Sequence, residues 1–297
     1  MNYSIIIVTY NRCDLLKECI SCALNQTVPA NHIIVVNNAS TDATKAYLDS
    51  VGDARVIVEH MEENTGGAGG FYKGMQTAHL LGDDMHIIID DDAMLSPDFA
   101  ELLIGKAQEF PQIMAFAGSV LTDGRIVTEH RQILKRPGYR MKKIEAAQYE
   151  KDIFYCDTAS FCGLMIRDKV IELVGLPEKK YFIWYDDTEY CIRIRKLSNI
   201  MVVPKARLNH KVLVGAAEWP RRYTWKDYYG IRNRIHMVRK HGNLADYIVL
   251  RIWLVINSGI RNRIFNILKF HNQDWKNEMD IYKRAVKDSA RFIKQKD

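Results

Sequence analysis

The chain has 297 residues, 47% hydrophobic and 26% charged, a composition that excludes a disordered or fibrous protein. Its formal net charge of +6 is divided unevenly, because residues 219–297 hold 18 Lys and Arg against 7 Asp and Glu, whereas the other 218 residues hold 24 against 29. An acidic part followed by a basic part predicts two segments with different partners.

The first apolar run, from Ile5 to Val8, has no basic residues before it and is too short to span a bilayer. We therefore expect no signal peptide and a protein that stays in the cytoplasm or at the cytoplasmic face of the membrane. The six cysteines suit this compartment as small buried side chains, since they have neither the spacing nor the His partners of a zinc site.

Buried strands and helices alternate along the first 92 residues. Continuous apolar runs predict strands at 3–9, 32–36, 55–59 and 85–89, and apolar residues at helical spacing predict helices from about 12, from about 42 to 49, and at 70–81. This order is typical of an α/β fold with a mostly parallel sheet and helices on both faces. Ligands of such sheets bind beyond the carboxyl ends of the strands, where every polar motif of this region lies.

The rest of the chain is more mixed. We expect short strands at 113–117, 161–167 and 200–203, a helix at 187–197, and basic helical segments near 225–241, 244–270 and 275–295. The sequence therefore predicts an α/β domain over residues 1–218 and a mainly helical, basic extension over residues 219–297.

Three adjacent carboxylates, Asp90, Asp91 and Asp92, follow the fourth predicted strand. Folding alone does not favour this arrangement because the charges repel one another, whereas a hard divalent cation relieves the repulsion. Alternate residues of an extended segment point the same way, so Asp90 and Asp92 could face one metal ion and a diphosphate. A solvated acidic turn and the N-cap of a helix are the alternatives.

Residues 64–71 have the sequence Asn-Thr-Gly-Gly-Ala-Gly-Gly-Phe and precede a predicted helix. Glycines permit close backbone approach and positive φ angles, so this segment is predicted to be a loop that presents backbone N–H groups to a ligand. It lacks the Lys-Ser/Thr of a P-loop and follows the third strand, which disfavours ATP hydrolysis and a dinucleotide fold. A plain flexible loop is the alternative.

Residues 184–189 have the sequence Trp-Tyr-Asp-Asp-Thr-Glu. Paired carboxylates beside aromatic rings suit a sugar site, in which rings pack on C–H surfaces and a carboxylate accepts a hydroxyl proton. An ordinary helix start with acidic residues is the alternative, and both can hold together. His210 closes a strand-like segment, and a lone His is more often structural.

As an ordered set, these motifs resemble those of inverting glycosyltransferase family 2, which has the GT-A fold. The resemblance covers roughly residues 1–235 and rests on T-Y-N-R, V-V-N-N-A-S-T-D, N-T-G-G-A-G-G-F, D-D-D, W-Y-D-D-T-E and a later His. The glycine-rich and W-Y-D-D-T-E segments are most similar to those of bacterial galactofuranosyltransferases.

The resemblance implies transfer of galactofuranose from UDP-galactofuranose to a glycan or lipid-linked acceptor in bacterial cell-surface polysaccharide synthesis. A rhamnosyltransferase that uses a TDP-sugar is the alternative, and a nucleotide-sugar-binding protein without turnover is a more remote one. One base on the face opposite the leaving group implies a single displacement, and therefore inversion.

The resemblance also implies roles for individual residues. The expected catalytic base is Asp187, and the expected acceptor-binding residues are Trp184, Tyr185, Asp186 and Glu189. A Mn²⁺ or Mg²⁺ ion is expected at Asp90, Asp92 and His210. The residues expected to bind the UDP-sugar donor are Thr9, Tyr10, Asn11, Asn38, Asn64, Gly66, Gly67, Gly69, Asp90, Asp91 and Arg222.

One position departs from the family pattern. Many relatives have Asp where this chain has Asn37 or Asn38, and that carboxylate accepts a hydrogen bond from uracil N3–H. An Asn side-chain oxygen can accept the same bond, so we expect uridine to be bound here.

The basic extension mixes cations with aromatic residues between Trp219 and Tyr229, which suits a diphosphate, a lipid headgroup or nucleic acid. The segment from Tyr228 to Asn233 resembles one that follows the catalytic domain in this family, which favours a diphosphate, and no nucleic-acid motif is present. Residues 244–260 are apolar but interrupted by two charges, as in an interfacial helix. Peripheral membrane contact, a helical bundle packed on the main domain and a homo-oligomer contact remain as alternatives.

Overall fold

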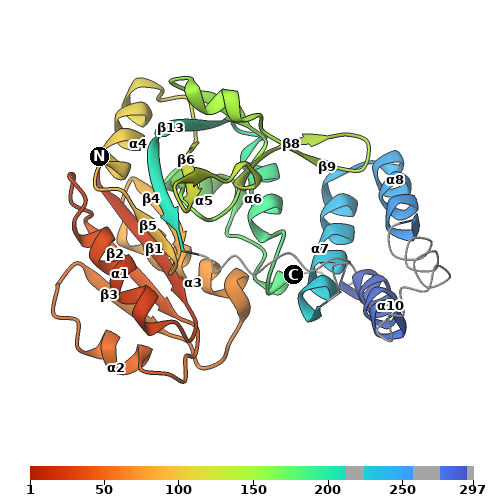
Figure 1. Ribbon diagram of the computed structural model, residues 1–297, viewed down its shortest axis with the longest axis horizontal. Helices are drawn as coiled ribbons and strands as arrows, with labels where there is room; N and C mark the ends of the chain where they lie inside the picture. Colours follow the sequence, from red (N-terminus) through yellow and green to blue (C-terminus); the bar gives the residue numbers. More distant parts are fainter. Residues whose placement is uncertain (212–223, 257–274, 293–297) are drawn as a thin grey trace. The chain divides into compact units, whose positions relative to one another are not determined.

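The structure is a computed structural model that describes residues 1–211, 224–256 and 275–292 (Figure 1). The chain forms two compact units. The first contains residues 1–133, 143–182 and 186–211, and the second contains residues 134–142, 183–185 and the described residues from 224 onward. The predicted domain boundary after residue 218 lies outside the described residues and stays a prediction.

The first unit is built on one large mixed sheet. Its strands are β1 (Tyr3–Thr9), β2 (His32–Asn37), β3 (Val56–His60), β4 (Met85–Asp90), β5 (Ala93–Leu95), β6 (Ala115–Thr122), β7 (Arg125–Ile126), β10 (Phe154–Cys156), β12 (Leu164–Arg167) and β13 (Ile200–His210). They lie in the order β10-β13-β6-β12-β4-β1-β2-β3, with β5 beside β13 and β7 beside β6. Strands β3, β2, β1 and β4 are parallel, and β12 runs antiparallel between β4 and β6.

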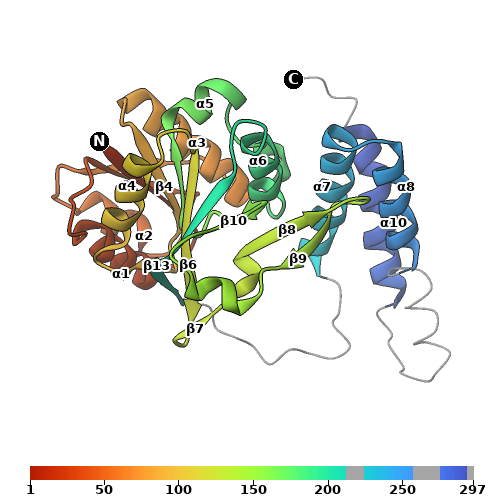
Figure 2. The same cartoon turned by 90° about the horizontal axis from the view of Figure 1, so that it is seen from above.

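Helices cover both faces of this sheet, as Figure 2 shows. One face packs on α1 (Cys13–Leu24), α2 (Thr44–Asp49) and α4 (Phe99–Glu109), and the other on α3 (Gly66–Leu81), α5 (Asp168–Val174) and α6 (Asp186–Ile194). Alternation along β1 explains both layers, because Ile5 and Ile7 belong to the first core cluster and Ile6 and Val8 to the second. The predicted α/β fold with a mostly parallel sheet and helices on both faces is confirmed.

The glycine-rich segment forms the first turn of α3, so the predicted loop is wrong. The helix begins at Gly66 rather than near Gly70. A Cβ atom added at Gly70 would lie 2.5 Å from Val8 Cγ1, and one added at Gly74 would lie 2.4 Å from Ile6 Cγ2. Glycine therefore allows α3 to lie close against β1, at a cost in helix propensity.

The second unit contains α7 (Trp225–His241), α8 (Leu244–Val255) and α10 (Trp275–Phe292), as the sequence predicts for its described residues. Predicted helical residues 257–270 lie outside them. A smaller sheet of β8 (Arg131–Lys135), β9 (Arg140–Lys143) and β11 (Thr158–Ala159) supplies the tip of a hairpin to this unit. Within the described ranges, no helix combines the length and apolar character needed to cross a membrane.

The hairpin tip is held on α8 by polar contacts. The backbone N–H of Gly138 donates to Asp246 Oδ1 at 3.0 Å, and Arg136 Nε donates to Asp246 Oδ2 at 3.0 Å. The hydroxyl of Tyr139 donates to the carbonyl of His241 at 2.8 Å. Asp246 also forms a capping box with Asn243, so one buried carboxylate both starts α8 and holds the hairpin.

Candidate active site

The carboxyl ends of β1, β2 and β4 bring together the polar segments that follow them. The backbone N–H of Asn38 donates to the carbonyl of Thr9 at 3.0 Å, and Thr9 Oγ1 donates to Asp91 Oδ2 at 2.7 Å. Asn11, whose φ is 54°, accepts a hydrogen bond from the backbone N–H of Thr41 at 2.7 Å. Asn tolerates this left-handed backbone better than most residues, so it suits the first turn.

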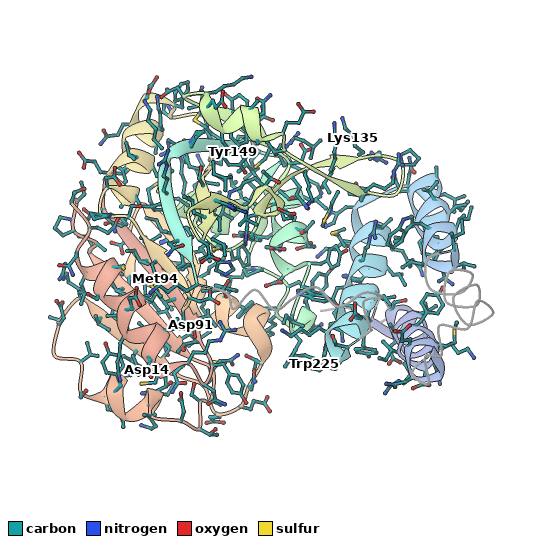
Figure 3. All side chains as sticks on the ribbon, viewed as in Figure 1. Asp14, Asp91, Met94, Lys135, Tyr149 and Trp225 are labelled. Carbon is teal, nitrogen blue, oxygen red and sulfur yellow. The ribbon has the colours of Figure 1, made fainter. Side chains whose placement is uncertain are left out.

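Arg12 bridges two carboxylates of the aspartate triplet. Its Nη1 atom lies 3.1 Å from Asp91 Oδ1 and 2.6 Å from Asp92 Oδ2. Figure 3 labels Asp91, which follows β4 directly. Burial raises the pKa of Asp91 to about 6, against the lowering effect of Thr9 and Arg12. The sequence analysis gives Arg12 no role. Its place in the T-Y-N-R motif, directly after the first strand, could have indicated that it lies at the site.

Asp90 has a different environment from its neighbours. Its pKa is raised well above the ordinary value by burial first, and then by the negative charges of Asp92, Asp91 and Asp186. The triplet is therefore neither a solvated turn nor a helix N-cap, because β5 follows it and two of its three side chains are buried. The contribution of Asp186 means that the acidic start of α6 lies within electrostatic reach of the triplet.

Strand pairing brings His210 next to Asp92. Strand β13 runs antiparallel to β5, with His210 opposite Ala93, and His210 Nε2 lies 3.1 Å from Asp92 Oδ1. Burial opposes ionisation of Asp92, but His210 and Arg12 outweigh it and lower the pKa of that carboxyl. The ring of His130 packs edge-on against His210, with 5.1 Å between centroids, and burial lowers the pKa of His130 to about 3.

The Asp92–His210 pair fits a divalent cation. Asp92 Oδ1 is buried, and among the described residues its polar neighbour is His210 Nε2, which lies beside it without a well-aligned hydrogen bond. Two neighbouring ligands of an octahedral ion with bonds of about 2.1 Å lie about 3 Å apart, close to the observed 3.1 Å. Among the described residues, however, no three His, Cys, Asp or Glu side chains form a complete ligand group. The predicted three-ligand set with Asp90 therefore stays a prediction.

The side chain of Asn38 holds the segment that joins β3 to α3. Its Nδ2 donates to Asn64 Oδ1 at 3.0 Å and to the carbonyl of Gly66 at 2.9 Å. Its Oδ1 accepts from the backbone N–H of Thr65 at 3.0 Å. Both ends of this buried amide are thus engaged by the loop, so Asn38 positions the loop, and its predicted bond to uracil stays a prediction.

Two N–H groups of the same segment are engaged within the protein. The N–H of Gly66 donates to Asn64 Oδ1 at 2.8 Å, and that of Ala68 donates to the carbonyl of Phe182 at 3.1 Å. A Cβ atom at Gly66 would lie 2.0 Å from that carbonyl oxygen, and one at Gly69 would lie 2.2 Å from Thr65 Oγ1. The prediction that these glycines expose backbone donors is therefore wrong for Gly66, and packing explains both glycines. Gly67 has no such close neighbour, and the side chain of Tyr10 is exposed.

Two carboxylates begin α6. Asp187 Oδ1 accepts hydrogen bonds from the backbone N–H and the Oγ1 of Thr188, at 2.5 and 3.0 Å. Burial raises the pKa of Asp187, partly opposed by Thr188 and Arg131. Burial, followed by the charges of Asp187 and Glu189, raises the pKa of Asp186 to about 8. This edge therefore holds an ionised carboxylate, Asp92, and a pair with raised pKa values.

Glu189, which is predicted to bind the acceptor, forms an ion pair inside the first unit. It is completely buried, and its Oε2 lies 3.0 Å from Arg193 Nε and 2.7 Å from Arg193 Nη2. Arg193 also donates to the carbonyl of Leu176 at 3.0 Å. A carboxylate with no exposed surface cannot contact an acceptor in this conformation, so Glu189 stabilises the turn between α5 and α6.

Arg131 is a completely buried cation near Asp187 that the sequence did not reveal. Its Nε donates to the carbonyl of Gly118 at 3.0 Å, and its Nη2 donates to that of Cys162 at 2.8 Å. The pairing of β8 with β11 places Arg131 opposite Ala159. The N–H of Ala159 contacts Cys191, which lies one helical turn after Asp187 on α6. Nothing in the local sequence distinguishes this arginine from the other cations of the hairpin.

Trp184 and Tyr185 belong to the second unit. Their φ angles are 65° and 68°, which are costly for bulky residues. Asn233 Nδ2 donates to the carbonyls of Ile183 and Trp184 at 3.0 and 2.9 Å, and a Cβ atom at Gly230 would lie 2.7 Å from the Trp184 ring. The Tyr228–Asn233 segment therefore supports this strained backbone. Arg222, a predicted donor-binding residue, lies outside the described residues.

Comparison with known sequences places these features in one family. The sequence model of glycosyl transferase family 2 matches residues 4–173, more than half of the chain. The dTDP-rhamnosyl transferase RfbF of Shigella flexneri is 25% identical over 81% of this chain and 81% of its own length. Galactofuranosyltransferase GlfT1 of Mycolicibacterium smegmatis is 22% identical over 62% of each chain, so the match spans less than two thirds of that relative.

Solved structures share the fold at low sequence identity. TarS of S. aureus in complex with UDP is 15% identical with a TM-score of 0.60, covering 99% of this chain and 83% of its own. GalNAc-T7 with UDP, GalNAc and Mn²⁺ is 14% identical with a TM-score of 0.63, covering 80% of this chain and 48% of its own. At these identities the likeness establishes the GT-A fold alone.

Proposed function

Because the chain belongs to glycosyl transferase family 2, and so transfers a sugar from a nucleotide-sugar, we propose that it uses UDP-galactofuranose and inverts the anomeric carbon. The proposed acceptor is a hydroxyl group of a glycan or lipid-linked glycan in bacterial cell-surface polysaccharide synthesis. The observation that carries the mechanism is the contrast between an ionised carboxylate, Asp92, and the Asp186–Asp187 pair, whose pKa values are raised. Environments that push carboxylate pKa values apart indicate separate roles.

Asp187 is the proposed base that removes the proton of the acceptor hydroxyl. Its Oδ1 is fixed by Thr188, so the carboxylate is oriented before the acceptor arrives. A raised pKa makes it a better proton acceptor near neutral pH than an ordinary aspartate. Asp186 has a pKa of about 8, so it is mostly protonated at pH 7 and can donate a hydrogen bond to the acceptor.

Asp92 and His210, with Asp90, are the proposed ligands of Mn²⁺ or Mg²⁺. When bound, the ion would neutralise the charge that develops on the leaving diphosphate. Arg12 keeps Asp91 and Asp92 in place from the exposed side of the edge. Thr9, Tyr10 and the other predicted donor-binding residues, except Gly66, remain part of the proposal.

Two sugar donors are candidates. Similarity to the mycobacterial galactofuranosyltransferase supports UDP-galactofuranose. The rhamnosyl transferase of Shigella flexneri matches over a larger share of both chains, which favours dTDP-rhamnose as the second candidate. Both are pyrimidine nucleoside diphosphate sugars, and UDP bound to the structurally similar TarS supports a uridine site.

A panel of nucleotide-sugars tests this proposal. Purified protein is incubated with UDP-galactofuranose, UDP-galactose, UDP-GlcNAc or dTDP-rhamnose, with and without Mn²⁺, and release of UDP or TDP is measured. Release from UDP-galactofuranose alone supports the first candidate, and release from dTDP-rhamnose alone supports the second. Binding of a donor without release under any condition supports a non-catalytic nucleotide-sugar-binding protein.

A further inference from the structure

Helix α8 has an exposed apolar face. Five side chains, Leu244, Ile248, Ile252, Val255 and Ile256, retain between 47% and 73% of their accessible surface. Single exposed apolar residues are ordinary on protein surfaces, whereas five on one short element form a continuous patch. We call this patch the α8 stripe.

The spacing of these residues places them on one side of the helix. At 100° per residue, the five side chains fall within an arc of about 120°. The opposite side is already occupied within the same unit, because Asp246 binds the hairpin tip and Leu250 is buried. The α8 stripe therefore points away from the packing that holds α8 in its unit.

Cations lie beside the α8 stripe. The guanidinium groups of Arg239 and Arg251 both lie over the ring of Tyr247, at 5.3 and 5.8 Å from its centroid. On the helix, Arg251 is only about 20° from the edge of the stripe. Lys135, labelled in Figure 3, and Arg140 are exposed on the hairpin of the same unit.

The unit as a whole is positively charged. Its described residues hold 15 Lys and Arg against 5 Asp and Glu. In the whole chain the corresponding numbers are 42 and 36, so the rest of the protein is acidic. An exposed apolar stripe with cations at its border is the pattern of a helix that lies in the interface of an anionic bilayer.

We propose that the α8 stripe inserts into the surface of an anionic membrane, with the neighbouring Arg and Lys side chains contacting lipid phosphates. The inference rests on the proposed function in one respect. A lipid-linked acceptor is held at the membrane surface, so the proposed function gives a reason for membrane binding. The apolar insertion distinguishes this face from a purely electrostatic contact, which salt would abolish.

Co-sedimentation of the full chain with vesicles tests the proposal. Vesicles of phosphatidylcholine with and without phosphatidylglycerol are used at low and high salt. The Ile248→Ser/Ile252→Ser variant removes the centre of the stripe. Its matched control is Leu80→Ser/Leu173→Ser, which removes two exposed leucines of the first unit. Because all four positions are exposed, thermal unfolding should be similar in both variants.

We expect wild type and control to bind anionic vesicles, with partition weakened but not abolished at high salt. The stripe variant should bind at least about tenfold more weakly at either salt concentration. Equal binding of both variants, or no binding of wild type, overturns the proposal. The proposal is also overturned if the stripe variant keeps wild-type vesicle binding but sediments as a monomer where wild type sediments as a dimer. The face would then contact a second copy of the chain.

Nucleotide release measured on the same preparations separates the two proposals. With a water-soluble acceptor, the stripe variant should keep wild-type turnover. Absence of turnover in every preparation would count against the proposed function, while the vesicle result would still decide the role of the α8 stripe.

Discussion

His210 Nε2 lies 3.1 Å from Asp92 Oδ1, although the two residues come from distant parts of the chain. The antiparallel pairing of β13 with β5 produces this approach. A pair formed by strand register is held rigidly, and a buried carboxylate oxygen beside an imidazole nitrogen, with no well-aligned hydrogen bond among the described residues, suits an incoming cation.

Removing either member of this pair should remove metal-dependent turnover. Asp92→Ala and His210→Ala each delete one proposed ligand, so we expect kcat to fall at least about 100-fold at fixed Mn²⁺. The measurement is nucleotide release as a function of Mn²⁺ and Mg²⁺ concentration, with EDTA as the metal-free reference. Asp14→Asn is the control, because its side chain is 97% exposed on α1 and forms an ion pair with Lys17 on the same helix. Full wild-type activity in EDTA would exclude these residues as metal ligands.

Stability should fall as pH rises between about 4 and 8. The pKa of Asp186 is about 8 in the folded protein against an ordinary 3.8, so in this window the folded state keeps a proton that the unfolded state has lost. The free energy of unfolding then decreases with pH, and Asp187 and Asp90 add to the same trend. Asp186→Asn should flatten the dependence and raise the melting temperature at pH 8. Thermal unfolding from pH 5 to 8.5 checks this, and equal slopes in wild type and variant would contradict it.

Much of the fold follows from local patterns in the sequence. Runs such as Ile5 to Val8 are apolar at every position because both faces of a parallel strand are covered, and polar residues follow each run directly. The strand-end position of Asp91 and Thr9 could therefore be predicted, since parallel strands end at one edge.

Which side chains are already engaged by other residues could not be predicted in the same way. Glu189 belongs to an acidic motif, but its nearest cation, Arg193, lies one helical turn later and buries it. The residue type of Asn38 predicts contact with a nucleobase, and the sequence does not show that its amide also supports the loop before α3. Sequence gives the donor and acceptor types, and only packing decides which of them remain available.

The glycines of α3 provide a test of this distinction between packing and ligand binding. Gly74→Ala should destabilise the protein by about 1–3 kcal/mol, because the new Cβ atom would lie 2.4 Å from Ile6 Cγ2. Gly105→Ala is the matched control on α4, where an added Cβ meets nothing within 4 Å. That change should stabilise the protein by up to about 1 kcal/mol through helix propensity. Urea unfolding of both variants gives the comparison, and effects of the same sign would contradict the packing explanation.

The final prediction separates the two carboxylates that begin α6. Asp187→Asn keeps the size of the side chain and its bonds to Thr188 but removes the basic oxygen, so kcat should fall by about 10² to 10⁴. Donor affinity should stay within about threefold, because the expected donor contacts lie at the ends of β1, β2 and β4. Asp186→Asn preserves a neutral hydrogen-bonding group where the acid is mostly protonated at pH 7, and should therefore retain much more activity.

The pH profile distinguishes a base from a structural carboxylate. In wild type, kcat should rise with pH through an apparent pKa above 3.8, because the base acts only when ionised and burial raises its pKa. The residual activity of Asp187→Asn should lack this rise, while Asp186→Asn should leave the rise at nearly the same pH, because Asp186 is mostly protonated and uncharged where Asp187 ionises. Steady-state kinetics from pH 5 to 9, with nucleotide-sugar affinity measured by calorimetry, provides both quantities. Near-normal turnover in Asp187→Asn together with collapse in Asp186→Asn would assign the catalytic proton transfer to Asp186 instead.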